Sequence, residues 1–213
     1  MNAFRPASLP PRLVLATGNP GKLREMRAIL APWAVDVRAQ SEFTAGVAEE
    51  TGASFVENAI LKARYAAAAS GLPAIADDSG LEVDALHGAP GIYSARYAGV
   101  GTGDAANNER LLRELASVPD DRRTARYRCA LVYLRWPTDP APIVAQASWE
   151  GRIGRFPRGT GGFGYDPLFL VGDGSLAAAE FDADRKNEVS HRGQALKALV
   201  AALAGAPAAA IAP

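Results

Sequence analysis

Apolar runs of strand-like composition alternate along the chain with segments whose apolar residues recur at helical spacing. The run RLVLA at residues 12–16 predicts a short buried strand, and AVDVR at residues 34–38 predicts a second one. Between them, residues 21–30 place four apolar side chains on one helical face, namely Leu23, Met26, Ile29 and Leu30. The N-terminal part of the chain therefore predicts a strand–helix–strand unit.

The rest of the chain continues this alternation. Ser54 and Glu57 form a capping-box pattern that opens an alanine-rich helix, which is expected to end near Ser70–Gly71. Further helices are predicted over residues 104–116 and 190–203. Strands are predicted at 73–77 and 81–83 around a DDSG turn, at 127–135 and 143–149 as a hairpin with a long proline-rich loop, and at 168–171. Because βα units are mixed with a β-hairpin, we expect an α/β fold with a mixed sheet.

The size of the chain fits one such domain. With 213 residues, 48% of them hydrophobic, it can bury one sizeable core. Residues 1–12, rich in proline and small side chains, are expected to form a flexible extension, and residues 205–213 a flexible Ala/Pro tail. Residues 13–204 are then the folded domain.

Charge and cysteine content exclude several classes of protein. Lys and Arg number 23, as do Asp and Glu, and this balance argues against a nucleic-acid coat or a polybasic membrane binder. Cys129 is the only cysteine, which excludes an internal disulfide and a cysteine-based zinc site. No apolar run approaches the roughly 20 residues of a membrane span, and the N-terminal residues lack the apolar core of a signal peptide. A cytoplasmic protein with neither nucleic-acid nor membrane partners is therefore expected.

The motif TGNPGK, residues 17–22, follows the first predicted strand and opens the first predicted helix. Backbone N–H groups at a helix N-terminus carry partial positive charge and Lys22 adds a full one, which is how a polyphosphate is often held. The motif is not a Walker A loop, because Gly18 and Gly21 are too close together and no Ser or Thr follows Lys22. An ordinary strand-to-helix turn is the alternative.

Two adjacent carboxylates, Asp77 and Asp78, end an apolar run in the stretch PAIADDSGLEV. Asp, Ser and Gly are common turn residues, so a structural turn is one interpretation. A metal site is the other, because Mg²⁺ prefers one or two carboxylates together with water and phosphates, and Glu49 is a further loop carboxylate. If strand geometry continues to Asp78, the two side chains point to opposite faces, and only one of them faces a given ligand.

Two C-terminal segments could hold a base or an anion. In RGTGGFGYDP, residues 158–167, glycine allows close approach of a flat ligand, Phe163 can stack on a base and Asp166 can accept a hydrogen bond from a ring N–H. A flexible solvent loop is the alternative. In KNEVSHRGQALKAL, residues 186–199, Lys186, His191 and Arg192 surround a helix start, which favours an anionic or carbonyl-rich ligand.

Together these motifs resemble one family. LATGNPGKLREM, EETGASFVENAILKAR, AIADDSGLEVDALHGAPGIYSARYAG, GTGGFGYDPLF and KNEVSHRGQAL, in this order, are similar to the successive signatures of the inosine/xanthosine triphosphate pyrophosphatases. The resemblance covers about residues 13–204. It implies a two-lobed α/β fold with a long central mixed β-sheet flanked by helices, a cleft between the lobes, a homodimer and Mg²⁺ dependence.

The resemblance also implies roles for individual residues. Asp78 would be the general base and, with Glu49, a metal ligand, whereas a ligand role for Asp77 stays open against an orienting one. Lys62 would help Lys22 to neutralise the triphosphate. The implied substrate-binding residues are Thr17, Gly18, Asn19, Pro20, Gly21, Lys22, Lys62, Ser79, Phe163, Gly164, Tyr165, Asp166, Lys186, His191 and Arg192.

The implied reaction is the attack of water on the α-phosphorus of a non-standard purine triphosphate, with loss of pyrophosphate. Donors from His191 and Arg192 would favour the 6-oxo group of ITP, dITP or XTP over the amino group of adenine. A pyrophosphatase for other modified nucleotides and a non-catalytic nucleotide-binding protein are the alternatives.

Overall fold

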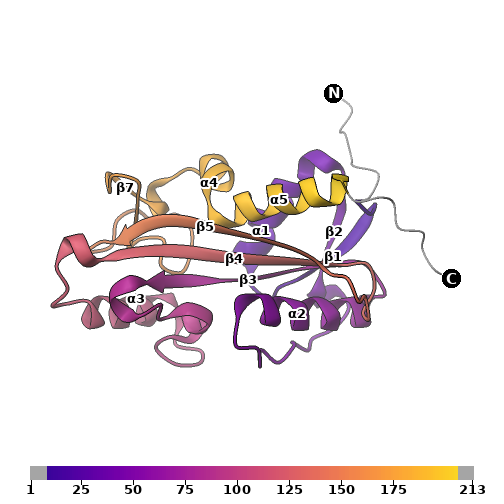
Figure 1. Ribbon diagram of the computed structural model, residues 1–213, viewed down its shortest axis with the longest axis horizontal. Helices are drawn as coiled ribbons and strands as arrows, with labels where there is room; N and C mark the ends of the chain where they lie inside the picture. The colour runs from indigo at the N-terminus through magenta and orange to yellow at the C-terminus, as the bar shows by residue number, and fades with distance from the viewer. Residues whose placement is uncertain (1–8, 206–213) are drawn as a thin grey trace. The chain divides into compact units, whose positions relative to one another are not determined.

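A computed structural model of the protein describes residues 9–205 (Figure 1). The strands are β1 (Arg12–Ala16), β2 (Asp36–Ala39), β3 (Ala74–Val83), β4 (Thr124–Leu134), β5 (Ile143–Ile153), β6 (Phe169–Val171) and β7 (Leu176–Ala177). The α-helices are α1 (Pro20–Leu30), α2 (Phe55–Ser70), α3 (Gly103–Glu114), α4 (Ala183–Val189) and α5 (His191–Gly205). Short 3₁₀ helices cover Ala31–Trp33, Gln40–Glu42, Asp84–Leu86, Gly91–Arg96, Asp120–Arg122 and Ala178–Glu180.

The strands form one mixed sheet of seven, in the order β2-β1-β3-β4-β5-β6-β7. β1 runs parallel to both of its neighbours, with Leu15 opposite Ala39 on β2 and Ile75 on β3. β6 runs antiparallel to β5 and β7. The expected α/β fold with a mixed sheet flanked by helices is therefore confirmed.

The chain divides into two compact units. Of the described residues, the first unit contains 9–78, 130–146 and 192–205, and the second contains 79–129 and 147–191. The flexible segments predicted at 1–12 and 205–213 fall mostly outside the described residues. Within them, Leu9 is buried and the carbonyl of Pro11 accepts a hydrogen bond from the N–H of Asp36, so the described part of the N-terminal segment is packed.

In the first unit, α2 lies on one face of β1 and β3, and α1 and α5 lie on the other (Figure 1). The predicted N-cap of α2 is present, because the Ser54 hydroxyl accepts from the N–H of Glu57. The carboxylate of Glu57 accepts from this hydroxyl rather than from the backbone N–H that a capping box uses. The core of this layer is built largely from small side chains, namely Ala59, Ala63, Ala66 and Ala67 of α2 against Val14, Ala16, Ala74 and Ala76 of the strands. Such small residues allow the helix to approach the sheet closely, which brings the side chain of Lys62 to β3.

The core of the second unit is built from larger side chains. Leu111 and Leu115 from the α3 segment pack with Tyr127 of β4, Trp149 of β5 and Phe169 of β6. A buried arginine fastens this unit, because the guanidinium of Arg123 donates to the backbone carbonyls of Leu115, Ile153 and Gly154 at 2.7–2.9 Å. Tyr127 and Trp149 therefore belong to the packed core of this unit.

Most predicted elements are present, but the predicted turn at DDSG is wrong. β3 continues through Asp77, Asp78 and Ser79 to Val83, so the two expected short strands are one strand of ten residues. Both aspartates are buried and each is paired with cations, which outweighs the preference of these residue types for a turn. α4 and β7 are short elements that the hydrophobic pattern did not predict.

The loop between β4 and β5 is held by one buried carboxylate, that of Asp139. It accepts hydrogen bonds from the Arg135 side chain and from the backbone N–H groups of Arg135 and Ala141. Burial opposes its ionisation, but these hydrogen bonds outweigh burial and lower its pKa to about 2. The predicted long hairpin loop is therefore an ordered structure.

We expect Asp139→Asn to lower the free energy of unfolding at pH 7 by about 2 kcal/mol, which corresponds to the lowered pKa. Because the folded pKa lies below the unfolded one, this contribution is complete above about pH 4 and is lost as the pH falls towards 2. Urea unfolding of both proteins across this range measures the difference. Asp121→Asn, at an exposed position, is the control, and a difference that stays constant with pH would contradict the assignment.

Candidate functional site

The TGNPGK segment forms the exposed entry to α1. The Asn19 side chain caps the helix, since its Oδ1 accepts from the N–H of Gly21 at 2.8 Å and of Lys22 at 3.1 Å. The N–H of Asn19 donates to the hydroxyl of Thr17, while Gly18 and Pro20 are exposed. Three of the amides expected to bind phosphate, those of Asn19, Gly21 and Lys22, therefore already have an acceptor, which a phosphate oxygen would have to replace.

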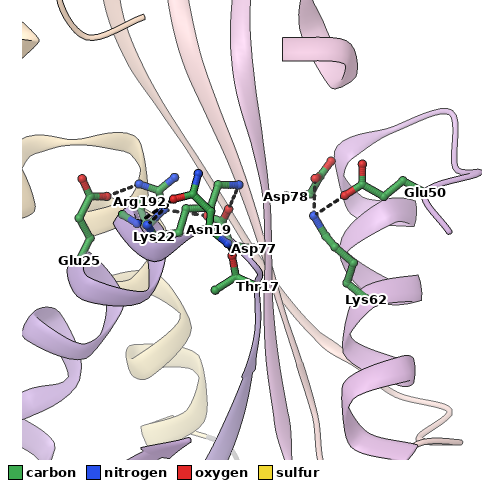
Figure 2. Close-up of polar contacts among 10 residues, drawn as sticks. Thr17, Asn19, Lys22, Glu25, Glu50, Lys62, Asp77, Asp78 and Arg192 are labelled. Carbon is green, nitrogen blue, oxygen red and sulfur yellow. Dashed lines mark hydrogen bonds and ion pairs between the residues drawn. The ribbon is translucent and has the colours of Figure 1, made fainter. Parts of the chain in front are cut away.

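Asp77 and Asp78 point to opposite sides of β3, as the alternation of side chains along a strand requires (Figure 2). Asp77 faces α1 and α5, where it contacts the Lys22 ammonium, and its Oδ2 accepts from Arg192 Nε at 2.9 Å. Arg192 also pairs with Glu25 of α1. Burial alone would raise the pKa of Asp77, but the charges of Arg192 and Lys22 outweigh it and hold the pKa well below its usual range.

Asp78 faces α2 on the other side of the strand. Its Oδ1 accepts from Lys62 Nζ at 2.5 Å, and the same ammonium donates to Glu50 at 3.1 Å (Figure 2). Burial raises the pKa of Asp78 in spite of the opposing charge of Lys62, and Glu50 raises it further. The pKa of Lys62 is also raised, because its carboxylate neighbours outweigh its burial. Asp78 is therefore the more basic of the two aspartates, because its pKa is raised whereas that of Asp77 is lowered.

Glu50, rather than Glu49, is the glutamate that the structure brings to this cluster. Glu49 is exposed, whereas Glu50 is partly buried and shares Lys62 with Asp78. Sequence reasoning also missed Glu25, which pairs with Arg192. Its spacing of three residues from Lys22 on a helix places the two on one face and could have indicated it.

The donor set at Asp78 fits a magnesium ion. Within residues 9–205, no group of three or more His, Cys, Asp or Glu side chains is arranged to hold a metal. Mg²⁺, however, is usually bound through one or two carboxylates together with water and substrate phosphates. Asp78 and Glu50 both contact the ammonium of Lys62, so the two carboxylates face one position, which a cation already occupies.

In the second unit, the carboxylate of Asp166 organises the predicted base-binding residues. Its Oδ2 accepts from Lys186 Nζ at 2.6 Å and from the N–H of Phe163 at 2.8 Å, and its Oδ1 accepts from the hydroxyl of Tyr127 at 3.1 Å. The Lys186 ammonium lies 5.1 Å from the centre of the Phe163 ring. Asp166 is 3% exposed, so its geometry positions the lysine and the loop rather than presenting a free acceptor to a ligand.

The surroundings of two glycines in this loop explain why they are glycine or how they are held. Gly162 has a φ of +73°, and a Cβ there would lie 2.0 Å from Asp166 Oδ2, so any side chain would displace the carboxylate. Both backbone polar groups of Gly164 bond to side chains of α3, since its N–H donates to Asp104 and its carbonyl accepts from Asn108. Tyr165 is buried and its hydroxyl donates to the carbonyl of Ser94. The segment is therefore an ordered loop, and the alternative of a flexible solvent loop is wrong.

His191 and Arg192 contact different partners although they are adjacent in sequence. The His191 ring stacks on Tyr127 with centroids 4.7 Å apart and an angle of 11° between the planes. Arg192 instead pairs with Asp77 and Glu25. Consecutive helical residues diverge by about 100° around the axis, which separates their contacts. Ser79, the remaining predicted substrate residue, follows Asp78 on β3 and is partly buried.

No helix within residues 9–205 is long and apolar enough to cross a membrane.

Known proteins are similar to this chain over nearly its whole length. The model of the Ham1 family matches residues 13–202. The dITP/XTP pyrophosphatase of Thioalkalivibrio sulfidiphilus is 58% identical over 194 residues, which cover 91% of this chain and 99% of that protein. The protein of the same name from Shigella flexneri is 57% identical over 90% of this chain and 98% of its own length. The structure of a HAM1 protein from Coxiella burnetii matches with a TM-score of 0.83 at 47% identity and covers 92% of this chain and 99% of that one. A family match over nearly the whole length and relatives above 50% identity establish that this chain belongs to the Ham1 family.

Proposed function

We propose that this protein hydrolyses the non-standard purine nucleoside triphosphates ITP, dITP and XTP to the nucleoside monophosphate and pyrophosphate in a Mg²⁺-dependent reaction. The observation that carries the proposal is the buried carboxylate of Asp78, whose raised pKa suits a general base and whose partner Lys62 also holds Glu50. The names of the relatives support the substrate class.

The proposed chemistry uses the two sides of β3 differently. Asp78 accepts a proton from a water molecule while the oxygen of that water bonds to the α-phosphorus. The bond from this phosphorus to the oxygen that bridges it to the β-phosphorus breaks, and pyrophosphate leaves. Asp78 and Glu50 would hold Mg²⁺, and Glu49, the glutamate predicted from the sequence, is a further candidate ligand. The ion would neutralise phosphate charge and make bound water more acidic. On the other side, Asp77 holds Lys22 and Arg192 in place and is proposed as an orienting group rather than a ligand.

The phosphate and base would be bound by separate groups of residues. Lys22 and Lys62 are proposed to bind the triphosphate together with the entry to α1, formed by Thr17, Gly18, Asn19, Pro20 and Gly21. Ser79 is proposed to contact it beside Asp78. The base would stack on Phe163 of the loop that Gly164, Tyr165 and Asp166 shape, with Lys186, His191 and Arg192 as donors that favour a 6-oxo group. Adenine would leave such donors without an acceptor.

The biological setting is part of the proposal. Removal of these nucleotides would keep them out of DNA and RNA, and a cytoplasmic location follows from where nucleoside triphosphates are used. We also propose that the protein is a homodimer, as the family resemblance implies.

A substrate panel tests this function. Pyrophosphate release is measured with dITP, ITP, XTP, dGTP, dATP and modified pyrimidine triphosphates, with Mg²⁺ and with EDTA. We expect hydrolysis of the first three to exceed that of dATP by about 10⁴-fold and to stop in EDTA. Equal rates on dGTP or dATP would refute the selectivity, faster release from the pyrimidines would favour the alternative substrate, and nucleotide binding without release would favour a non-catalytic protein.

A further inference from the structure

We infer that Tyr127 is a positioning residue for base recognition, because one buried tyrosine holds both Asp166 and His191. The inference rests on the proposed function, in which those two residues belong to the base-binding group. Neither the hydrophobic pattern nor the motifs single out Tyr127, which lies inside the β4 strand.

The contacts of Tyr127 join two segments that are far apart in sequence. Its hydroxyl donates to Asp166 Oδ1 at 3.1 Å, and Asp166 in turn accepts from Lys186 and from the N–H of Phe163. Its ring lies parallel to that of His191, with 4.7 Å between centroids. One side chain therefore fixes the loop beside Phe163 at its hydroxyl end and the imidazole on its face.

The surroundings make Tyr127 a rigid support. Tyr127 is 7% exposed, and its ring centre lies 4.6 Å from that of Phe169 and 6.4 Å from that of Trp149. The ring centres of Trp149 and His191 are 6.5 Å apart. Because β4 and β5 carry Tyr127 and Trp149, the plane of the His191 ring is set by the sheet rather than by α5 alone. A fixed ring plane sets the direction in which the imidazole nitrogens point. A hydrogen bond that distinguishes one base from another requires such a fixed direction.

Two substitutions separate the ring from the hydroxyl. Tyr127→Leu removes the stacking surface and the hydroxyl, so we expect the KM for dITP to rise about tenfold while kcat changes less than about twofold, since aromatic pairs contribute on this scale and the base is remote from the reacting phosphorus. Preference for dITP over dATP should fall with it. Tyr127→Phe keeps the stack and should keep the KM within about threefold. Phe169→Leu is the control, because Phe169 packs on Tyr127 and Trp149 in the same core.

A spectroscopic readout is independent of activity. The chain contains two histidines, His87 and His191, so NMR of the ring protons in wild type and in His87→Gln assigns His191. We expect its signals to lie upfield of those in the urea-unfolded chain, through the ring current of Tyr127, and to return downfield in Tyr127→Leu but not in Phe169→Leu. If Tyr127→Leu does not fold, Tyr127→Met replaces it.

The outcomes decide between the possibilities. A KM and a His191 shift that change equally in Tyr127→Leu and Phe169→Leu would mean that Tyr127 only fills the core, and would overturn the inference. A folded wild type without an upfield His191 signal would overturn it as well. If wild type released no pyrophosphate from any nucleotide while the His191 shift depended on Tyr127, the proposed function would fail and the positioning contact would stand.

Discussion

Asp78→Asn is expected to reduce pyrophosphate release from dITP by about 10³-fold or more, while dITP binding changes by less than about threefold. The amide keeps the shape of the carboxylate but cannot accept the proton of the attacking water, and general-base help is worth about 10²–10⁴ in rate. Loss of one of the two carboxylates that would hold Mg²⁺ adds to the effect. Single-turnover rates and calorimetric binding of a non-hydrolysable dITP analogue measure the two quantities.

The stability of this variant distinguishes lost chemistry from lost structure. Because burial raises the pKa of Asp78, its ionised form is less favourable in the folded protein than in water, and Lys62 keeps Glu50 as a partner when Asp78 is replaced. The free energy of unfolding should therefore fall by only about 1–2 kcal/mol. Glu82→Gln on the same strand is the control, since Glu82 pairs at the surface with Arg128. Near-normal turnover in Asp78→Asn would remove Asp78 from the role of base.

Short sequence patterns predicted correctly those helices and strands whose boundaries depend on neighbouring residues. The boundaries of β1 match the apolar run at residues 12–16, and the capping-box pattern marks the start of α2 at Phe55, directly after Ser54. In both, the signal is a periodicity or a cap contained within a few residues, so no knowledge of distant contacts is needed. The mixed α/β class follows from the order of these elements.

The DDSG segment was predicted wrongly for a physical reason. Turn preference reflects the hydrogen bonds that Asp and Ser side chains make with the backbone nearby and the conformational freedom of Gly. In β3 the side chains of Asp77 and Asp78 instead pair with Arg192 and Lys62. Arg192 is 115 residues away from Asp77 in sequence, so no local window contains the cation that makes a strand possible. The alternation of the two side chains was nevertheless predictable once strand geometry was assumed.

Other residues of the site could not be identified from the sequence, because their part in it depends on tertiary contacts. Glu49 and Glu50 are indistinguishable by type, and only the packing of their loop beside α2 gives Lys62 to Glu50. Tyr127 has the signal of any buried strand residue, because its function would lie in contacts with Asp166 and His191. Positioning residues of this kind are therefore the part of a site that a sequence pattern predicts least well.

Asp77→Asn, one residue away from Asp78, is expected to lower the free energy of unfolding by about 3–5 kcal/mol, the range measured when one partner of a buried ion pair is removed. The Arg192 side chain is 2% exposed and pairs with both Asp77 and Glu25, whereas Asp77 also pairs with Lys22. The amide would therefore leave this buried group of two cations and two carboxylates with one negative charge too few. Such a loss is a large part of the 5–15 kcal/mol typical of a folded protein. Urea unfolding at pH 7 measures it.

A double variant tests the physical cause. If the cost comes from an uncompensated buried charge, Arg192→Met in the Asp77→Asn background should restore about 1–3 kcal/mol, although each single change destabilises. Additive losses, or an Asp77→Asn protein as stable as Asp78→Asn, would contradict this cause. The same isosteric change at two neighbouring aspartates thus separates their roles, because at Asp77 it should remove stability and at Asp78 turnover.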